Sequence, residues 1–358
     1  MMENIYNGIC RHESDEGIIN RSTGKRYPTA LRAMLETESL QDLVAYDSIV
    51  LPESAPKKSL LELYKERFLQ LRRDNEYLEL WWGGGYDSTM ILYASAMVGE
   101  PVDAIVMYCN GDPRHDKSGM NWELNANYRH LYHYDEVWTS DIKIPRHTID
   151  IFKMWDIVKT KYHDYELWCS SSYGCLDDIS RIAADDLLRE HRAGRQGTII
   201  TGKGYGGVVY DDRYDKWSYY SEALAMNYPG ATSNELKVTR FFRTPEIIRA
   251  TAEQARTWFY KNRPEVDGTW ATTEPWDHDN HRYPELFGQI EHLGKSLSWQ
   301  DHPKTAGWMS DMKTRERFPE YWKFCDWLDA NIPKNCFRQQ STFADRGIEN
   351  PEPHVINF

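Results

Sequence analysis

The segment that most constrains the fold places a strand, a glycine turn, a helix and a second strand within about thirty residues. Residues 76–82 (EYLELWW) have the pattern of a buried strand that runs directly into Gly83-Gly-Gly. Apolar side chains then recur at helical spacing, and Gly99 and Pro101 mark the end of that helix. Residues 102–108 (VDAIVMY) form a second apolar run. A unit of this size predicts a right-handed βαβ crossover, and therefore a parallel sheet.

The rest of the chain repeats this alternation, which predicts an α/β fold. A helix is expected from Ser59, acting as N-cap, to about Asp74. Later elements are expected in the order helix near Asn121–Leu131, strand near Glu136–Thr139, helix near Thr148–Lys159, helix at about Asp177–Glu190 and strand at Thr198–Thr201. We divide the chain into an N-terminal extension at 1–56, an α/β nucleotide-binding domain at 57–210 and a mainly helical region at 211–358.

Composition limits the partners that this chain can have. Its 358 residues carry a net charge of -12, which argues against a broad electrostatic contact with nucleic acid but leaves room for a small basic site. Mean hydropathy is -0.72, and no apolar stretch is long enough to span a bilayer. The start of the chain lacks a basic region followed by an apolar one, so we expect a cytoplasmic enzyme. The six cysteines include no C-x-x-C pair, which predicts reduced thiols.

Two glycine-rich turns follow predicted strands, the position where open α/β sheets bind ligands. Residues 197–204 approach a Walker A loop, but Gly204 replaces the hydroxyl that holds magnesium and the residues before Gly202 have the pattern of a strand. Residues 202–207 spell G-x-G-x-x-G, the dinucleotide-binding fingerprint. Residues 208–215 do not open as an amphipathic helix, which a bound pyrophosphate requires. Both interpretations of the second turn are therefore disfavoured.

The first turn, at residues 83–89, combines the parts of a phosphate site. Three glycines allow a tight reversal of the backbone and a close approach of phosphate. Their amides and those of the helix that begins near Asp87 form an anion-binding nest, with hydroxyl donors following. Asp87 would repel phosphate unless a divalent cation lay between them, which indicates a magnesium–phosphate complex. The predicted binding residues of this turn are Gly83, Gly84, Gly85, Tyr86, Asp87, Ser88 and Thr89.

This turn resembles the S-G-G-x-D-S pyrophosphate loop of the PP-loop ATP pyrophosphatases, with Gly83 in place of the usual serine. Within that superfamily the chain is most similar to the synthetase domain of asparagine synthetase. Thr201-Gly-Lys-Gly204 stands where that family has a second glycine signature, and Arg243–Ile248 resembles the segment that opens its C-terminal helices. The resemblance covers about residues 60–260. It implies an adenine-nucleotide alpha-hydrolase-like parallel-sheet domain of the HUP type.

The resemblance further implies an ATP-dependent, AMP-forming ligase that uses ATP and Mg²⁺. Such enzymes adenylate a carboxylate or carbonyl, release pyrophosphate, and let a nitrogen nucleophile displace AMP. The first turn would hold the pyrophosphate, with Asp87 as metal ligand and catalytic residue. The backbone at Val106–Tyr108 would meet the adenine, so Tyr108 is expected at the nucleotide. Gly202 and Gly204 would approach from the opposite side, where Lys203 neutralises charge.

A lysine from the C-terminal region is also implied near the phosphates. Lys304 is the preferred candidate and Lys295 the other. The chain departs from the family at Tyr205-Gly-Gly207, where an acidic pair is usual, and Asp211 or Asp212 would have to replace it. Position 2 is Met and Cys10 is internal, so the nucleophile of a glutaminase half is missing. We therefore do not expect this chain to obtain ammonia from glutamine.

Two other functions remain as alternatives. Cys169 and Cys175 would suit a sulfur-transfer or sulfonucleotide reductase relative, and a nucleotide-binding protein without catalysis would tolerate the departures from the family pattern. Asp277-His-Asp-Asn-His281 has metal-ligand residue types but is interpreted as a solvated loop. Asp112 and His115 follow the second strand and are expected at the edge of the substrate cleft. The acceptor is a small molecule or a modified base, and no membrane partner is expected.

Overall fold

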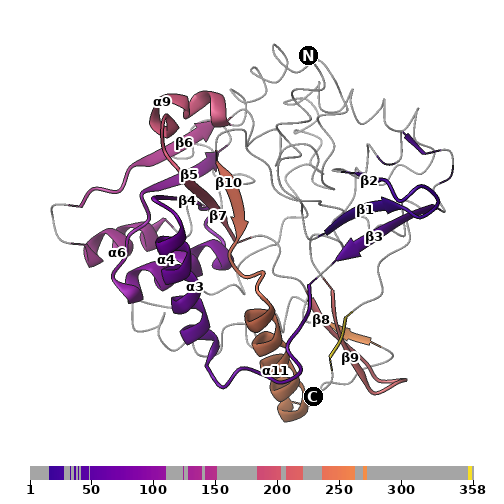
Figure 1. Ribbon diagram of the computed structural model, residues 1–358. Coiled ribbons are helices and arrows are strands. Elements are labelled where there is room, and N and C mark those ends of the chain that lie inside the picture. The colour runs from indigo at the N-terminus through magenta and orange to yellow at the C-terminus, as the bar shows by residue number, and fades with distance from the viewer. Residues whose placement is uncertain are drawn as a thin grey trace, which may run out of the picture.

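The computed structural model describes three sheets with helices around the largest of them (Figure 1). The described residues are 16–27, 33, 36–37, 39, 42–47, 49–109, 124, 128–138, 142–150, 184–202, 207–220, 236–262, 269–271 and 354–356. In this part of the chain no helix is both long and apolar enough to cross a membrane.

The central sheet has five strands, and every neighbouring pair is parallel. Its spatial order is β10-β7-β4-β5-β6. The strands are β4 (Tyr77–Trp81), β5 (Ala104–Cys109), β6 (Arg146–Asp150), β7 (Gly197–Thr201) and β10 (Lys237–Arg240). The chain builds outward from β4 to β6, then returns to the other side of β4 to form β7 and β10. This is a doubly wound sheet whose order reverses between β4 and β7.

The first helices form where local signals predict them. Helix α3 (Leu60–Asp74) begins with a complete capping box, in which the Ser59 side chain accepts from the Glu62 amide and the Glu62 carboxylate accepts from the Ser59 amide. Helix α4 (Tyr86–Val98) ends at Gly99, whose left-handed φ of 72° suits glycine. Helix α4 joins β4 to β5, and the parallel pairing of these two strands confirms the predicted βαβ unit.

One face of the sheet packs against a row of helices. Helix α4 contacts α3 on one side and α6 (Arg129–Val137) on the other, and α3 also contacts α11 (Pro245–Asn262). The core beneath them contains Leu78 and Leu80 from β4. It also holds an aromatic cluster in which Tyr64 of α3 packs edge-on against Phe242, with ring centroids 5.2 Å apart. All five residues of β4 are buried, as expected for a central parallel strand covered on both faces.

The opposite face of β4 carries a buried ionic cluster. The Glu79 carboxylate accepts from Arg192 Nε at 3.0 Å and from Trp81 Nε1 at 2.7 Å, and Arg192 also pairs with Asp185. Glu79 and Arg192 are both almost completely inaccessible to solvent. Arg192 ends the short helix α9 (Arg189–Arg192), which lies directly before β7. The cluster therefore ties the segment that leads into β7 to the central strand.

Two antiparallel sheets lie outside the central one. The first has the order β2-β1-β3 and the second the order β11-β8-β9-β12. Apolar side chains of the second sheet, including Trp217, pack against α11. The strands are β1 (Glu16–Asn20), β2 (Arg26–Tyr27), β3 (Leu43–Asp47), β8 (Gly207–Asp211), β9 (Lys216–Tyr220), β11 (Thr269–Ala271) and β12 (His354–Ile356).

Several sequence-based expectations need correction. The strand predicted near Glu136–Thr139 is wrong, because Glu136 and Val137 end α6. The helical stretch predicted near Asn121–Leu131 is confirmed at Leu124 and from Arg129 onward, and its other residues before Tyr128 lie outside the described residues. The third strand of the sheet is β6, which takes the first residues of the helix predicted near Thr148–Lys159. Beyond residue 210 the described chain contains α11 but also four strands, and β10 belongs to the central sheet. Residues 177–183 of the predicted helix at Asp177–Glu190 lie outside the described residues.

Removing one partner from the buried cluster should be costly. We expect Arg192→Met to lower the free energy of unfolding by about 3–5 kcal/mol, because it leaves the Glu79 carboxylate buried without its cation. Urea unfolding of the purified chain measures this. Lys58→Ala is the control: it removes the exposed Lys58–Glu66 pair, 2.7 Å long, and should cost less than about 1 kcal/mol. Equal losses for the two variants would contradict a structural role for the cluster.

Stability should also fall in mild acid because of two histidines beside this cluster. The rings of His147 and His191 lie 4.3 Å apart, and burial lowers the pKa of both. The folded chain thus binds these protons less readily than the unfolded chain, so stability is lost as pH drops below the ordinary histidine pKa of about 6.5. Urea midpoints between about pH 7.5 and 5.5 should decline less for His147→Gln than for the parent. Parallel pH profiles for the two proteins would refute this coupling.

Candidate functional site

The candidate site lies at the carboxyl ends of β4 and β7, where the strand order of the sheet reverses. In open α/β sheets this is the position at which the connecting loops diverge and leave a crevice for a ligand. The two glycine turns singled out in the sequence follow these two strands. The first turn begins at Gly83 after β4, and the second begins at Gly202 after β7.

The first turn reverses the chain through one position, Gly84, that only glycine suits well. Gly84 has a φ of +84°, a left-handed conformation that would strain a residue with a side chain. Gly85 is the N-cap of α4, and the Thr89 amide donates to its carbonyl at 3.0 Å. Before the turn, the Trp82 amide donates to the Val106 carbonyl at 2.9 Å, which continues the β4–β5 pairing. The turn therefore starts from a fixed strand end and leads at once into a helix.

The two hydroxyls of this turn are used to hold it together. Ser88 Oγ accepts from the Gly83 amide at 3.3 Å and donates to the Gly85 carbonyl at 3.1 Å. The indole Nε1 of Trp82 donates to Thr89 Oγ1 at 3.0 Å, and Thr89 is buried. Ser88 and Thr89 were expected to donate to a ligand. In this structure both hydroxyls connect the strand end to the first turn of α4, Thr89 as an acceptor and Ser88 as both acceptor and donor.

The donors left for an anion are backbone amides at the start of α4. The first amides of any helix have no acceptor within the helix, and its N-terminus carries a partial positive charge. At α3 a capping box satisfies such amides, whereas α4 begins at Gly85 with no side-chain cap. Asp87 lies in this first turn and is partly exposed. The arrangement can bind an anion on the amides while Asp87 binds a cation beside it.

The second turn closes against the first. A Cβ atom built on Gly202 would lie 2.9 Å from the amide nitrogen of Ser88 and 2.7 Å from Cβ of Asp87. Only a residue without a side chain fits this contact. The structure thus brings Gly202 to the start of α4. Lys203 and Gly204 lie outside the described residues.

The competing interpretations of the second turn do not agree with the secondary structure. Residues 197–201 form β7, so they are not a loop that wraps a phosphate, as a Walker A motif would require. Residues 207–211 form β8 rather than a helix, which removes the helix N-terminus needed by a dinucleotide fingerprint. The secondary structure on which the sequence disfavoured both interpretations is therefore confirmed for residues 197–201 and 207–211.

The remaining predicted residues fall into two groups. Tyr108 lies near the carboxyl end of β5, one strand away from the first turn. Asp211 ends β8, where its carboxylate accepts from Arg213 Nη2 at 2.7 Å, and this hydrogen bond lowers the pKa of Asp211. The others lie outside the described residues: Lys304, Lys295, Asp112, His115, Cys169, Cys175 and residues 277–281.

The fit to magnesium rests on one carboxylate. Within the described ranges, no three His, Cys, Asp or Glu side chains gather as a metal site. Magnesium nevertheless commonly binds through one or two carboxylates together with phosphate oxygens and water. Asp87 beside an anion-binding helix terminus agrees with that mode. It does not agree with a metal held by protein ligands alone.

Sequence analysis did not predict the side chains that hold the two turns in place from within the protein. The indole Nε1 of Trp82 donates a hydrogen bond to Thr89 Oγ1, and the Glu79–Arg192 ion pair fixes the segment before β7 against β4. An aromatic residue directly before the glycines and an acidic residue within an apolar strand were the available signals. Neither reveals its partner without the tertiary structure.

A scan against models of protein families and a search of curated proteins each found no match.

The close approach of Gly202 to α4 can be tested by adding a methyl group. We expect Gly202→Ala to lower the free energy of unfolding by about 1–3 kcal/mol, because the new Cβ would overlap the Ser88 backbone. Gly83→Ala is the matched control: a Cβ there has no atom within 4 Å, so the change should stay within about 0.5 kcal/mol. Chemical denaturation compares the two variants. If Gly202→Ala were as stable as Gly83→Ala, the two turns would not be in contact.

Proposed function

We propose that this chain is an AMP-forming enzyme of the PP-loop type, which binds ATP with Mg²⁺ at residues 83–89 and adenylates a carboxylate or carbonyl substrate. The observation that carries the proposal is the start of α4, which has no side-chain cap and lies against Gly202 at the switch point of the sheet. Such a helix terminus favours the charge of a phosphate.

The sheet topology supports a nucleotide as the ligand. In order along the chain, the five parallel strands occupy spatial positions 3-2-1-4-5, an order found in doubly wound nucleotide-binding folds. The assignment to the PP-loop class within these folds rests on the resemblance of residues 83–89 to the pyrophosphate loop. Asp87 within that loop favours a phosphate accompanied by a divalent cation over a bare anion.

Each residue then has a separate task. The amides at the start of α4 hold the β- and γ-phosphates, which leave together as pyrophosphate. Asp87 would hold Mg²⁺, which when bound neutralises charge on the phosphates. The backbone near Tyr108 faces the adenine, and Gly202 leaves space for the nucleotide on the other side. Lys203 and Lys304 are proposed to neutralise charge on the phosphates as the bond to the α-phosphorus breaks.

The internal hydrogen bonds of the turn explain how such a site would accelerate the reaction. Phosphoryl and adenylyl transfers depend mainly on positioning and on electrostatic stabilisation of the developing charge. Thr89 and Ser88 hold the loop in place before any ligand arrives, through bonds to Trp82 and Gly83. The amides therefore need little rearrangement when negative charge moves onto the leaving pyrophosphate.

The proposal predicts which bond of ATP is broken. With Mg²⁺ and ATP labelled at the α-phosphate, incubated with a panel of amino acids and other carboxylic acids, we expect labelled AMP or acyl-adenylate and free pyrophosphate. Asp87→Asn should lower AMP formation by a factor of about 100 or more, because it removes the charge that holds the metal. Thin-layer chromatography of the labelled products measures both results.

The control for charge loss is Glu53→Gln, which neutralises an exposed carboxylate before α3. It should leave AMP formation unchanged. Labelled ADP as the product would overturn the proposal, and so would full activity of Asp87→Asn. Binding of Mg-ATP without turnover for any acid in the panel would favour a nucleotide-binding protein without catalysis.

A further inference from the structure

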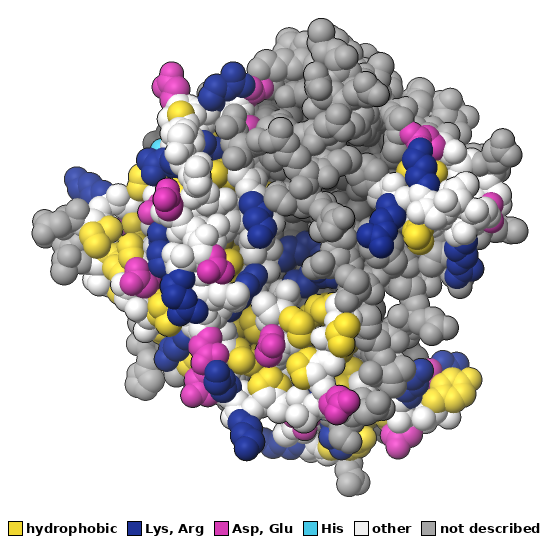
Figure 2. All heavy atoms as spheres, viewed as in Figure 1, with side chains coloured by type: hydrophobic (Ala, Val, Ile, Leu, Met, Phe, Trp, Pro, Cys, Tyr) yellow, Lys and Arg dark blue, Asp and Glu magenta, His cyan; other side chains and the backbone are white. Residues whose placement is uncertain are grey.

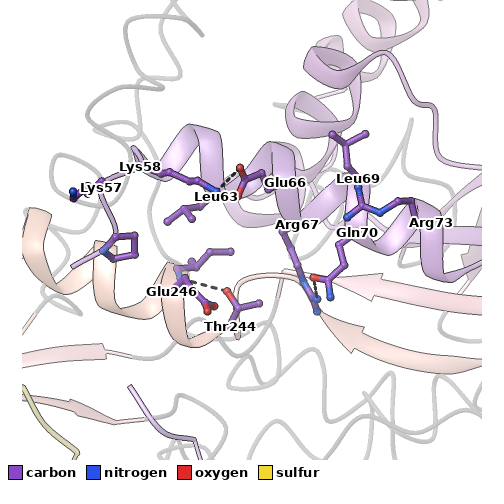
Figure 3. A pocket seen from close by; sticks show the side chains of 12 residues that line it. Lys57, Lys58, Leu63, Glu66, Arg67, Leu69, Gln70, Arg73, Thr244 and Glu246 are labelled. Atoms are coloured by element: carbon purple, nitrogen blue, oxygen red, sulfur yellow. Dashed lines mark hydrogen bonds and ion pairs between the residues drawn. The ribbon is translucent and has the colours of Figure 1, made fainter. Parts of the chain in front are cut away.

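A basic groove lies away from the switch point, between α3 and the start of α11. It has a volume of about 760 Å³. Figure 3 shows Arg67 and Gln70 extending from α3 toward the start of α11, and Lys58 reaching Glu66. The groove is lined by Pro56, Lys57, Lys58, Leu63, Glu66, Arg67, Leu69, Gln70, Arg73, Thr244, Glu246 and Ile247.

The charge of this groove is opposite to that of the whole chain. Of the described residues that line the groove, four are cations and two are carboxylates, whereas the protein carries a net charge of -12. Lys58 is neutralised by Glu66, with Nζ 2.7 Å from both carboxylate oxygens. Lys57 and Arg73 have no ion pair with any described residue. The groove therefore offers positive charge that the described protein does not itself neutralise.

Arg67 adds a cation that is partly withdrawn from water. Its Nη1 donates to Gln70 Oε1 at 3.0 Å. Its Nε is buried and has no acceptor among the described residues. A guanidinium with an unused buried donor gains more from an anion than a fully solvated one does. The start of α11 also faces this groove, with the Ile247 amide capped by Thr244 Oγ1 at 3.3 Å.

The cations are spread along the groove rather than gathered at one point. Arg67 and Arg73 are six residues apart on α3, a rise of about 9 Å, and Lys57 precedes the helix at its other end. A single phosphate cannot reach all of them, whereas a chain of phosphates can. Among the described residues that line the groove there is no aromatic side chain, so they offer no ring on which a base can stack. Figure 2 shows basic, acidic and hydrophobic side chains together over α3 and α11.

We propose that this groove binds the phosphate backbone of a nucleic acid, through Lys57, Arg67 and Arg73. The contact is to phosphates and not to bases, so it fixes position without reading sequence. The acidic remainder of the surface opposes a polyanion, so the affinity should be low and should depend strongly on salt. This surface is separate from the proposed nucleotide site, and the inference does not depend on AMP formation.

The test measures binding of a fluorescent duplex of about 20 base pairs by anisotropy. With three phosphate contacts, affinity should fall roughly 40-fold between about 50 and 200 mM salt. The double variant Lys57→Ala with Arg73→Ala should weaken binding and reduce the slope of log affinity against log salt by about two. The control Lys216→Ala with Lys261→Ala removes the same charge from exposed positions outside the groove and should leave the slope unchanged.

Three further ligands, a single strand, polyglutamate and tripolyphosphate, distinguish a duplex phosphate backbone from other anions. A single strand of the same length should bind no more tightly than the duplex, because stacking contributes nothing. Polyglutamate and inorganic tripolyphosphate are added as competitors of the bound duplex. If polyglutamate displaced the duplex as well as tripolyphosphate does, recognition of phosphate would be overturned. If the groove bound tripolyphosphate but not the duplex, its ligand would be a small polyphosphate and the proposal would be overturned. Absence of duplex binding, or equal binding by the groove variant and the control variant, would overturn the proposal. Circular dichroism of each variant establishes that it is folded.

Discussion

The structure depends on how the chain returns to the middle of the sheet. After β6 the chain must cross back to the other side of β4. The ion pair between Glu79 of β4 and Arg192 of α9 fixes the segment that leads into β7 at that side. Glu79 is flanked on the neighbouring strands by the apolar residues Ala104 and Ile199, so Arg192 supplies its cation from outside the sheet. Because an unpaired charge in this position would be very costly, the pair favours one placement of the segment before β7 over others.

That placement determines the candidate site. Once β7 pairs with β4, residue 202 emerges against the first turn of α4, and only glycine fits there. The same turn is held from within by hydrogen bonds of Trp82, Ser88 and Thr89, so the amides proposed to bind phosphate belong to one hydrogen-bonded unit. The stability of the sheet and the shape of the site are therefore parts of one packing arrangement.

Local sequence signals predicted the elements that carry their own start and stop residues. The capping box at Ser59 and the left-handed glycine at position 99 define helix ends by contacts within a few residues. Prediction failed near Glu136, where a run typical of a strand instead ends a helix. There Tyr134 is buried and its hydroxyl lies 2.6 Å from Ser95 Oγ of α4, a contact that holds the segment as a helix against its neighbour. Tertiary packing overrode a weak local preference.

The sequence by itself determined the βαβ unit, the parallel pairing and the turn at residues 83–89, because glycines, caps and apolar spacing act over short distances. Only the tertiary structure decided that β7 pairs with β4, that Gly202 closes on α4 and that Glu79 finds Arg192, since these partners lie more than a hundred residues apart along the chain. It also showed that the hydroxyls of Ser88 and Thr89 are used within the turn. The residue types show which hydrogen bonds and ion pairs a side chain is able to form, whereas the fold determines which partner it contacts.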